Sequence, residues 1–320
     1  MKSIKSSFEK YQESPRLHSS SLYMTAKLNS GPPKGRVIEI FGQEASGKTY
    51  VALDLGVQGL REYKKAILRF YDCEFAFTHD FIKPHINKPY MDRFFLHQNN
   101  VAEQVLPEIE KNMKKDIEKG FIPIVIVDSI AALATDAEMG MEEYERKANF
   151  DFQKFMGLFL KKNIGTNIRH GWLILINQVR TEISMNKFVK EHPDGIVTPG
   201  GKAIRFYASL RLYLKAMSKS KMKKEFGKKV DSYHGIRVKI EKTKFGRKTT
   251  FYMKVNEDLL LDAHHGLDEL LTEAGVIISR QKGLYSLRNK PDKKYRWNQL
   301  CQMLLTDKNK PKVLKALGLQ

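Results

Sequence analysis

Cysteine and long apolar runs are scarce in this sequence, and each shortage excludes a class of protein. Its 320 residues include 2 cysteines, Cys73 and Cys301, too few for a disulfide framework and without metal-binding spacing. Apolar runs break within about ten residues, short of the roughly 20 that span a membrane. The N-terminal MKSIKSSFEKYQESPRL lacks the apolar core of a signal peptide. We therefore expect a cytoplasmic protein without a membrane partner.

Acidic residues are in short supply as well. There are 36 Asp and Glu against 56 Lys and Arg, a formal net charge of +20. Residues 202–254 alone hold 17 basic and 3 acidic residues. Concentrated positive charge indicates a polyanionic partner, and nucleic acid is the first candidate. Within this stretch the lysine run at residues 219–229 predicts a mobile connection between strands that attracts DNA non-specifically, or a merely solvated loop.

Apolar strands alternate with amphipathic helices between residues 31 and 266, which indicates an α/β fold around a central, mostly parallel sheet. We expect strands at residues 36–42, 65–74, 94–98, 121–128, 171–180, 206–217, 235–244 and 248–255, and helices at 48–63, 101–120 and 150–164. Residues 1–30 are polar and predict a short N-terminal arm. From residue 267 to residue 320 the pattern changes to short helices and a small β element, which predicts a small, basic C-terminal α+β subdomain.

The stretch GQEASGKT lies between an expected strand and an expected helix, the context that a phosphate-binding loop requires. Its residues are Gly42, Gln43, Glu44, Ala45, Ser46, Gly47, Lys48 and Thr49. Glycines let backbone N–H groups curl around phosphate oxygens, and the helix N-terminus adds its positive dipole end. Lys48 supplies a charge for the outer phosphates, and the Thr49 hydroxyl is a ligand for Mg²⁺. The sequence thus predicts a nucleoside triphosphate site; the alternative is a chance match in a glycine-rich turn.

Three polar residues at strand ends are candidates for the rest of this site. Asp128 closes the apolar run IVIVD, at the edge where ligands of α/β sheets bind, and fits either a Mg²⁺ partner or a helix N-cap. Glu74 follows the second strand and fits either a base that activates water or a solvated turn residue. Gln178 ends the strand LILINQ and fits either a sensor of the terminal phosphate or a polar residue that leaves the core.

These motifs resemble the RecA family of recombinases, and most of all its divergent bacteriophage members. The matching stretches occur in the family's order, namely GRVIEIFGQEASGKT, FYDCEFA, VIVDSIAAL, LILINQVR and PGGKAIRFYASLRL. The resemblance implies a RecA-like P-loop ATPase core at residues 31–266, with ATP and Mg²⁺ as cofactors. It implies that Asp128 holds Mg²⁺ through water, that Glu74 is the catalytic base, and that Gln178 relays the state of the γ-phosphate to a DNA-binding loop. It also implies protomer contacts through residues 1–30, in a bacterial host cytoplasm if a phage encodes the protein.

The resemblance places DNA contacts in two loops. The second, at residues 181–199, exceeds about 15 residues, and loops of that length are usually functional or disordered. The first is expected near residues 139–147. The expected DNA-binding residues are Met141, Arg180, Ile183, Met185, Phe188, Gly200, Gly201 and Lys202. Apolar side chains would lie between bases, while basic side chains and backbone N–H groups meet phosphates. The alternative is a pair of insertions that contact no DNA.

Two lysines stand out near the end of GIRVKIEKTKFG. Ile236, Val238 and Ile240 alternate inward, as a half-buried strand requires. Lys242 and Lys244 share that parity, and ammonium groups do not end inside a core without partners. We therefore expect the strand to carry both past the edge of the sheet, toward an anion; the alternative is a frayed hairpin end. The resemblance implies that they reach a neighbouring protomer's ATP and act catalytically in trans, as an arginine finger does.

The residues and the resemblance together predict a DNA-dependent ATPase, specifically an ATP-dependent DNA strand-exchange recombinase. Copies of it would form a helical filament on single-stranded DNA and pair that strand with homologous duplex DNA, in recombination and repair. A loader and a single-strand binding protein are further candidate partners. The main alternative is a RecA-fold hexameric helicase or another DNA-dependent motor ATPase. A small-molecule kinase would leave the charge excess unexplained, and a mediator without turnover would not need Lys48, Asp128 and Glu74.

Overall fold

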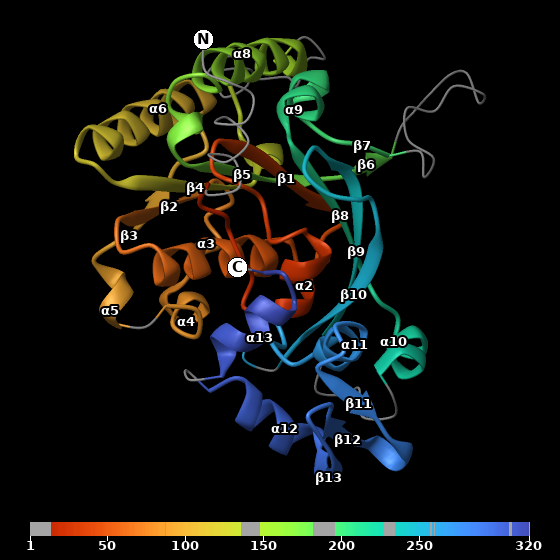
Figure 1. Cartoon of the computed structure of the whole chain (residues 1–320). Helices are drawn as coiled ribbons and strands as arrows, with labels where there is room; N and C mark the ends of the chain where they lie inside the picture. The colour runs from red at the N-terminus through yellow and green to blue at the C-terminus, as the bar shows by residue number, and fades with distance from the viewer. Residues whose placement is uncertain are drawn as a thin grey trace.

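One large sheet runs through the middle of the protein, with helices on both of its faces (Figure 1). The computed structural model describes residues 14–86, 88–135, 148–181, 196–226, 234–256, 258, 260–306 and 309–319. The sheet has eight strands in the order β10-β9-β8-β1-β5-β4-β2-β3. Neighbours from β8 to β3 are parallel, whereas β9 and β10 form an antiparallel hairpin that extends the sheet from β8. The predicted α/β fold with a mostly parallel sheet is confirmed.

The strands of this sheet are β1 (Arg36–Gly42), β2 (Ala66–Asp72), β3 (Phe94–Gln98), β4 (Ile122–Asp128), β5 (Trp172–Gln178), β8 (Leu210–Ala216), β9 (His234–Thr243) and β10 (Thr250–Val255). The helices around it are α2 (Leu22–Lys27), α3 (Lys48–Glu62), α4 (His79–Ile82), α5 (Lys88–Met91), α6 (Ala102–Glu118), α8 (Ala148–Asn163), α9 (Gly201–Tyr207) and α10 (Lys219–Phe226). A short ribbon pairs β6 (Arg180–Thr181) with β7 (Ile196–Val197).

Alternate residues of the central strands face opposite layers of helices. In β1, Ile38 and Ile40 belong to the buried cluster that includes Val51 and Leu55 of α3. Val37, which has the opposite parity and so faces the other side of the sheet, belongs to a second cluster that includes residues of α6 and α8. Burial of each such side chain stabilises the fold by about 1.5–3 kcal/mol. The two packed layers hold the parallel strands in register, so the carboxyl ends of β1, β5, β4 and β2 meet at one edge of the sheet.

The C-terminal elements have a buried cluster of their own. They are α11 (Leu267–Glu273), β11 (Ile277–Ser279), β12 (Leu284–Leu287), β13 (Lys290–Arg296), α12 (Trp297–Leu304) and α13 (Lys310–Ala316). The three strands form a small antiparallel sheet, and Leu22 of α2 joins Leu267, Leu271 and Leu300 in the cluster. The division of the chain into units 1–30, 31–266 and 267–320 stays a prediction.

Two local predictions were wrong. A strand was expected from residue 206, but Phe206 and Tyr207 end α9 and β8 begins at Leu210. The lysine run was expected to be a mobile connection between strands or a solvated loop, but α10 forms a helix over its first eight residues, and the rest lies outside the described residues. In each case one apolar side chain packs inward, Ile204 in α9 and Met222 in α10. α9 directly precedes β8 in the sequence and α10 follows it. For segments this short, apolar content alone does not distinguish a helix from a strand.

Candidate functional site

The loop that joins β1 to α3 is shaped by two of its glycines. Gly47 has a φ of 85° directly before the first turn of α3, a left-handed conformation that other residues rarely adopt. A Cβ at Gly42 would lie 2.3 Å from the Leu214 carbonyl oxygen, so a larger residue does not fit there. The backbone N–H groups of this turn and the positive end of the α3 dipole form an anion site.

The hydrogen bonding of Lys48 and Ser46 indicates whether this loop fits a phosphate. Lys48 is buried, and its Nζ donates a hydrogen bond to the Gln43 carbonyl oxygen at 2.7 Å. Ser46 Oγ is buried and has no hydrogen-bond partner among the described residues. A buried hydroxyl without a partner costs about 1–3 kcal/mol. A phosphate oxygen beside the loop would accept from this hydroxyl and from Lys48, so the residues present fit the group.

Burial also sets the protonation of Lys48. Desolvation lowers the pKa of its ammonium group, while the carboxylates of Asp128, Glu74 and Glu44 act in the opposite direction. These three acids belong to three different segments, and all of them line the same cavity. The cavity therefore brings one cation and several acidic oxygens together, as a site for a nucleotide with its divalent cation requires.

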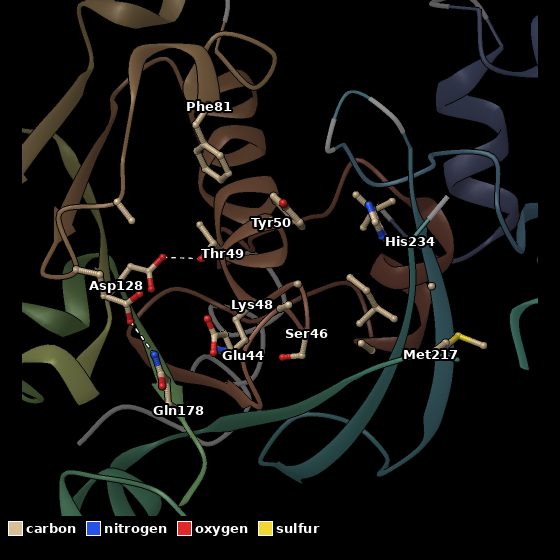
Figure 2. Close-up of a pocket in the computed structure, with 18 of the residues that line it drawn as sticks. Glu44, Ser46, Lys48, Thr49, Tyr50, Phe81, Asp128, Gln178, Met217 and His234 are labelled. Atoms are coloured by element: carbon tan, nitrogen blue, oxygen red, sulfur yellow. Dashed lines mark hydrogen bonds between the residues drawn. The ribbon is translucent and has the colours of Figure 1, made fainter. Parts of the chain in front are cut away.

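Asp128, at the carboxyl end of β4, meets the first turn of α3. The Thr49 hydroxyl donates a hydrogen bond to Asp128 Oδ2 at 2.6 Å, which Figure 2 shows as a dashed line. Burial raises the pKa of Asp128 to about 6, against the effects of the Thr49 hydrogen bond and of Lys48. These two oxygens are the donor types that Mg²⁺ prefers. In the described part of the chain no three His, Cys, Asp or Glu side chains cluster as a metal site.

Glu74 lies across the cavity and has two partners from distant segments. The Ser129 hydroxyl and the Gln178 side-chain amide both donate to Glu74 Oε1, the amide at 3.0 Å. Asp72 holds the turn that presents Glu74, because its carboxylate accepts hydrogen bonds from the backbone N–H groups of Ala76 and Phe77. The structure thus brings Glu74 and Gln178 together, as a base and a phosphate sensor would require.

The cavity continues beyond these polar residues to apolar walls that the sequence analysis missed. It encloses about 370 Å³. The Tyr50 and Phe81 rings are stacked, with centroids 5.8 Å apart, and Met217 and His234 lie on the far side of Tyr50 (Figure 2). Flat apolar surfaces of this kind suit a nucleobase. The aromatic density of FYDCEFAFTHDF was the available signal for Phe81; Met217 and His234 are joined to the site only by the pairing of β8 with β9.

The residues expected to bind DNA are only partly described. Met141, Ile183, Met185 and Phe188 lie outside the described residues. Arg180 is exposed in β6, and Lys202 is exposed in the first turn of α9. Gly200 and Gly201 have φ values of 82° and 71° and begin that helix. Their contacts with DNA stay predictions.

The expectation for Lys242 was wrong in one respect. A bulge in the pairing of β8 with β9 sets Leu212 opposite Ile240 but Arg211 opposite Lys242, which reverses the parity of the strand at Glu241. Lys242 therefore stays within the sheet, on the face of α9. Its Nζ donates hydrogen bonds to the carbonyl oxygens of Arg205 and Phe206, at 2.6 and 3.0 Å.

Lys244 lies just after β9 and is exposed, as expected. Burial lowers the pKa of Lys242, and the positive charges of Lys244 and Arg211 add to this effect. A role of either lysine at a neighbouring protomer's nucleotide stays a prediction.

No helix in the described ranges is long and apolar enough to cross a membrane.

A parallel sheet with a phosphate loop after β1, an acid at the end of β4 and a cavity between them defines the class of P-loop nucleotide-binding proteins. Within this class, the family model of the RecA N-terminal domain matches residues 7–263. The chain belongs to the RecA family.

Several bacterial proteins are similar to this chain at low identity. Protein RecA of Mycoplasmopsis pulmonis is 33% identical over 218 residues, 67% of this chain and 58% of that protein. Protein RecA of Methylobacterium sp. strain 4-46 is 32% identical over 239 residues, 74% of this chain and 60% of that protein. Protein RecA of Streptococcus equi subsp. zooepidemicus is 33% identical over 230 residues, 71% of this chain and 56% of that protein. The chain thus spans somewhat more than half the length of these relatives.

Proposed function

We propose that this protein is an ATP-dependent DNA strand-exchange recombinase that works as a helical filament on single-stranded DNA. The observation that carries the proposal is the hydrogen bond between Gln178 and Glu74. Gln178 ends a core strand, and residues 181–199, the predicted DNA-binding loop, follow it after two residues. One side chain is therefore bonded to the candidate base and lies next to the candidate DNA-binding segment. This arrangement supports hydrolysis that depends on DNA.

The polar and aromatic residues described above each have a chemical task in this proposal. The phosphate loop and Lys48 bind the phosphates, and Ser46 Oγ gains its missing partner there. Thr49 and Asp128 would hold Mg²⁺, which would neutralise charge on the phosphates when it is bound. Glu74 accepts a proton from the attacking water, and Gln178 orients that water or reports the γ-phosphate through its bond to Glu74. Tyr50 and Phe81 cover the base.

The distribution of charge supports a nucleic-acid partner. Residues 202–254 carry 17 basic residues, and this stretch includes most of α9, the strands β8 and β9 and most of β10; the three strands form one end of the sheet. Binding dominated by phosphate contacts has little base preference. It weakens as the salt concentration rises, because the release of counterions from the DNA is then less favourable. We expect the affinity for single-stranded DNA to fall by roughly a hundredfold or more between about 50 mM and about 200 mM salt. Tight, sequence-specific binding to duplex DNA in high salt would contradict the proposal.

Electron microscopy with single-stranded DNA and a slowly hydrolysed ATP analogue is the direct test. The proposal predicts helical filaments with the analogue and none without nucleotide. Closed rings, together with unwinding and no strand exchange, would instead support a RecA-fold hexameric motor. An ATPase that ignores DNA and phosphorylates a small molecule would exclude both. A joint-molecule assay with homologous and non-homologous duplex DNA then tests strand exchange itself.

A further inference from the structure

Glu39 is a fully buried carboxylate in the middle of the core. It lies in β1, the central strand between β5 and β8, and its exposed fraction is 0%. It takes no part in the cavity wall. A buried charge of this kind is costly unless partners compensate it, so its partners indicate what it does.

The partners of Glu39 come from both neighbouring strands. Arg211 Nε of β8 donates to Glu39 Oε2, and Asn177 Nδ2 of β5 donates to Glu39 Oε1 at 3.1 Å. The Arg211 guanidinium also lies over the Phe41 ring, 4.5 Å from its centroid. The carboxylate is therefore neutralised by one neighbour and hydrogen-bonded to the other.

Both the nitrogen and the oxygen of the Asn177 side-chain amide have hydrogen-bond partners. Its Nδ2 donates to Glu39 and also to the Pro199 carbonyl oxygen at 2.9 Å, while its Oδ1 accepts from the Gln178 backbone N–H at 3.1 Å. Carboxylate and carbonyl oxygens only accept, so the NH₂ group must face them and the amide has one possible orientation. Glu39 thereby fixes the amide that touches both Gln178 and the residue before Gly200.

The other end of α9 is held by a lysine next to the ion pair of Glu39. Arg211 is opposite Lys242 in the pairing of β8 with β9, and Lys242 donates to the carbonyl oxygens of Arg205 and Phe206 in the last turn of α9. Asn177, beside the start of α9, is hydrogen-bonded to Glu39, whereas Lys242, at its end, is only a strand neighbour of Arg211.

From this geometry we infer that Glu39 is a positioning residue that couples the nucleotide cavity to the DNA-binding segment. It acts through Asn177, which holds Gln178 at one side and the Pro199–Gly200 start of α9 at the other. The inference rests on the proposed function, because it assigns Glu39 to the DNA dependence of that same ATPase. A merely structural buried ion pair would affect stability without affecting this coupling.

The test compares Glu39→Gln with a matched control, Asp116→Asn. Asp116 forms a buried two-bond ion pair with Arg69, with both hydrogen bonds at 2.7 Å, and has no contact with the cavity or with α9 in the described residues. Both variants replace a buried, paired carboxylate by its amide. For Glu39→Gln we expect the stimulation of hydrolysis by single-stranded DNA to fall roughly tenfold, the effect of one lost hydrogen bond to a charged group. The Kd for nucleotide should stay at the wild-type value, and Asp116→Asn should keep full stimulation.

A double-mutant cycle tests whether Glu39 acts through Asn177. Asn177→Ala should lower DNA stimulation as much as Glu39→Gln does, and the double variant should be no worse than Asn177→Ala alone. Losses that multiply would overturn the inference, as would full stimulation in Glu39→Gln. If Glu39→Gln does not fold, Glu39→Asp takes its place in the cycle, since it keeps the charge beside Arg211 but is one methylene shorter.

Hydrogen exchange gives a readout that does not depend on the proposed function. Glu39→Gln should speed amide exchange in peptides that contain Gln178 and Gly200, and Asp116→Asn should not. Unchanged exchange at both positions would overturn the inference. A wild-type protein whose ATPase ignores DNA would refute the proposed function instead, and the exchange experiment would still decide whether Glu39 holds the two segments.

Discussion

Two lysine-bearing regions of the protein are built in opposite ways. Lys48 and Lys242 both donate to backbone carbonyl groups of their own chain. Around Lys48, the charges that act on its pKa are the carboxylates of Asp128, Glu74 and Glu44. Around Lys242, burial has the largest effect on its pKa, and the cations of Lys244 and Arg211 act in the same direction, against the carboxylate of Glu39. Lys48 is therefore faced by opposite charges from its own protomer, whereas two of the three charges that act on Lys242 are positive, a setting that would suit an anion from outside.

The largest effect is expected from a variant that disrupts the first of these two regions, the one around Lys48. Lys48→Ala removes the ammonium group at the phosphate loop, so nucleotide binding and hydrolysis should both be lost, with no turnover above background. Fluorescent-nucleotide titration and phosphate release measure the two losses. Lys64→Ala, at an exposed lysine beyond the end of α3, is the control. DNA-stimulated ATPase near the wild-type rate in Lys48→Ala would refute the phosphate-loop assignment.

The next prediction tests whether the second region acts across an interface. Replacing both Lys242 and Lys244 by Ala should reduce DNA-stimulated hydrolysis about a thousandfold, the scale of an arginine finger, while a single protomer still binds ATP. Because Lys242 also holds the end of α9, its loss disturbs the protomer itself. Lys244→Ala alone is therefore the cleaner variant, since that side chain is exposed.

Mixing variants sharpens this prediction. A Lys48→Ala protomer keeps intact lysines at positions 242 and 244, and the double variant keeps an intact phosphate loop. Mixed filaments should regain part of the ATPase activity at interfaces where the two complement each other. Mixed filaments that form but show no activity at any ratio would mean that the lysines act within their own protomer.

A milder change separates binding from chemistry in the first region. Glu74→Gln keeps the shape of the side chain and its contact with Gln178 but removes the basicity, so turnover should fall about a hundredfold or more. ATP affinity and filament formation should stay at wild-type levels. Single-turnover hydrolysis and nucleotide titration are the measurements. Loss of ATP binding together with turnover would show that Glu74 supports the fold of the cavity and is not the base.

The smallest expected effect is a dependence on pH. Burial raises the pKa of Asp128 to about 6, and only the ionised carboxylate serves as a partner of Mg²⁺. Affinity for the Mg²⁺–nucleotide complex should therefore fall as pH drops through 6, by about tenfold per pH unit below the pKa, and level off above it. Asp128→Asn and nucleotide without Mg²⁺ should both lose this slope. A slope that persists in Asp128→Asn would assign it to another group.

Most of the sheet and the phosphate loop were predictable because their signals are local. The apolar runs at residues 36–42 and 94–98 match β1 and β3 as observed, and the run at 65–74 contains β2. Short segments were harder to predict: α9 and α10 span only seven and eight residues, too few for a clear helical period, and one side chain of each, Ile204 and Met222, is buried against the core. The wall formed by Met217 and His234 was not predictable, because only the sheet pairing brings it to the nucleotide cavity.

The sequence by itself determined the phosphate loop, the acid at the end of β4 and the excess of positive charge, because each depends on neighbouring residues or on composition. Only the tertiary structure decided that Gln178 meets Glu74, 104 positions away, and that Lys242 lies within the sheet. The physical reason is register. Parallel strands bring their ends together only once packed layers of helices fix them side by side, and a single bulge reverses the face of every residue beyond it.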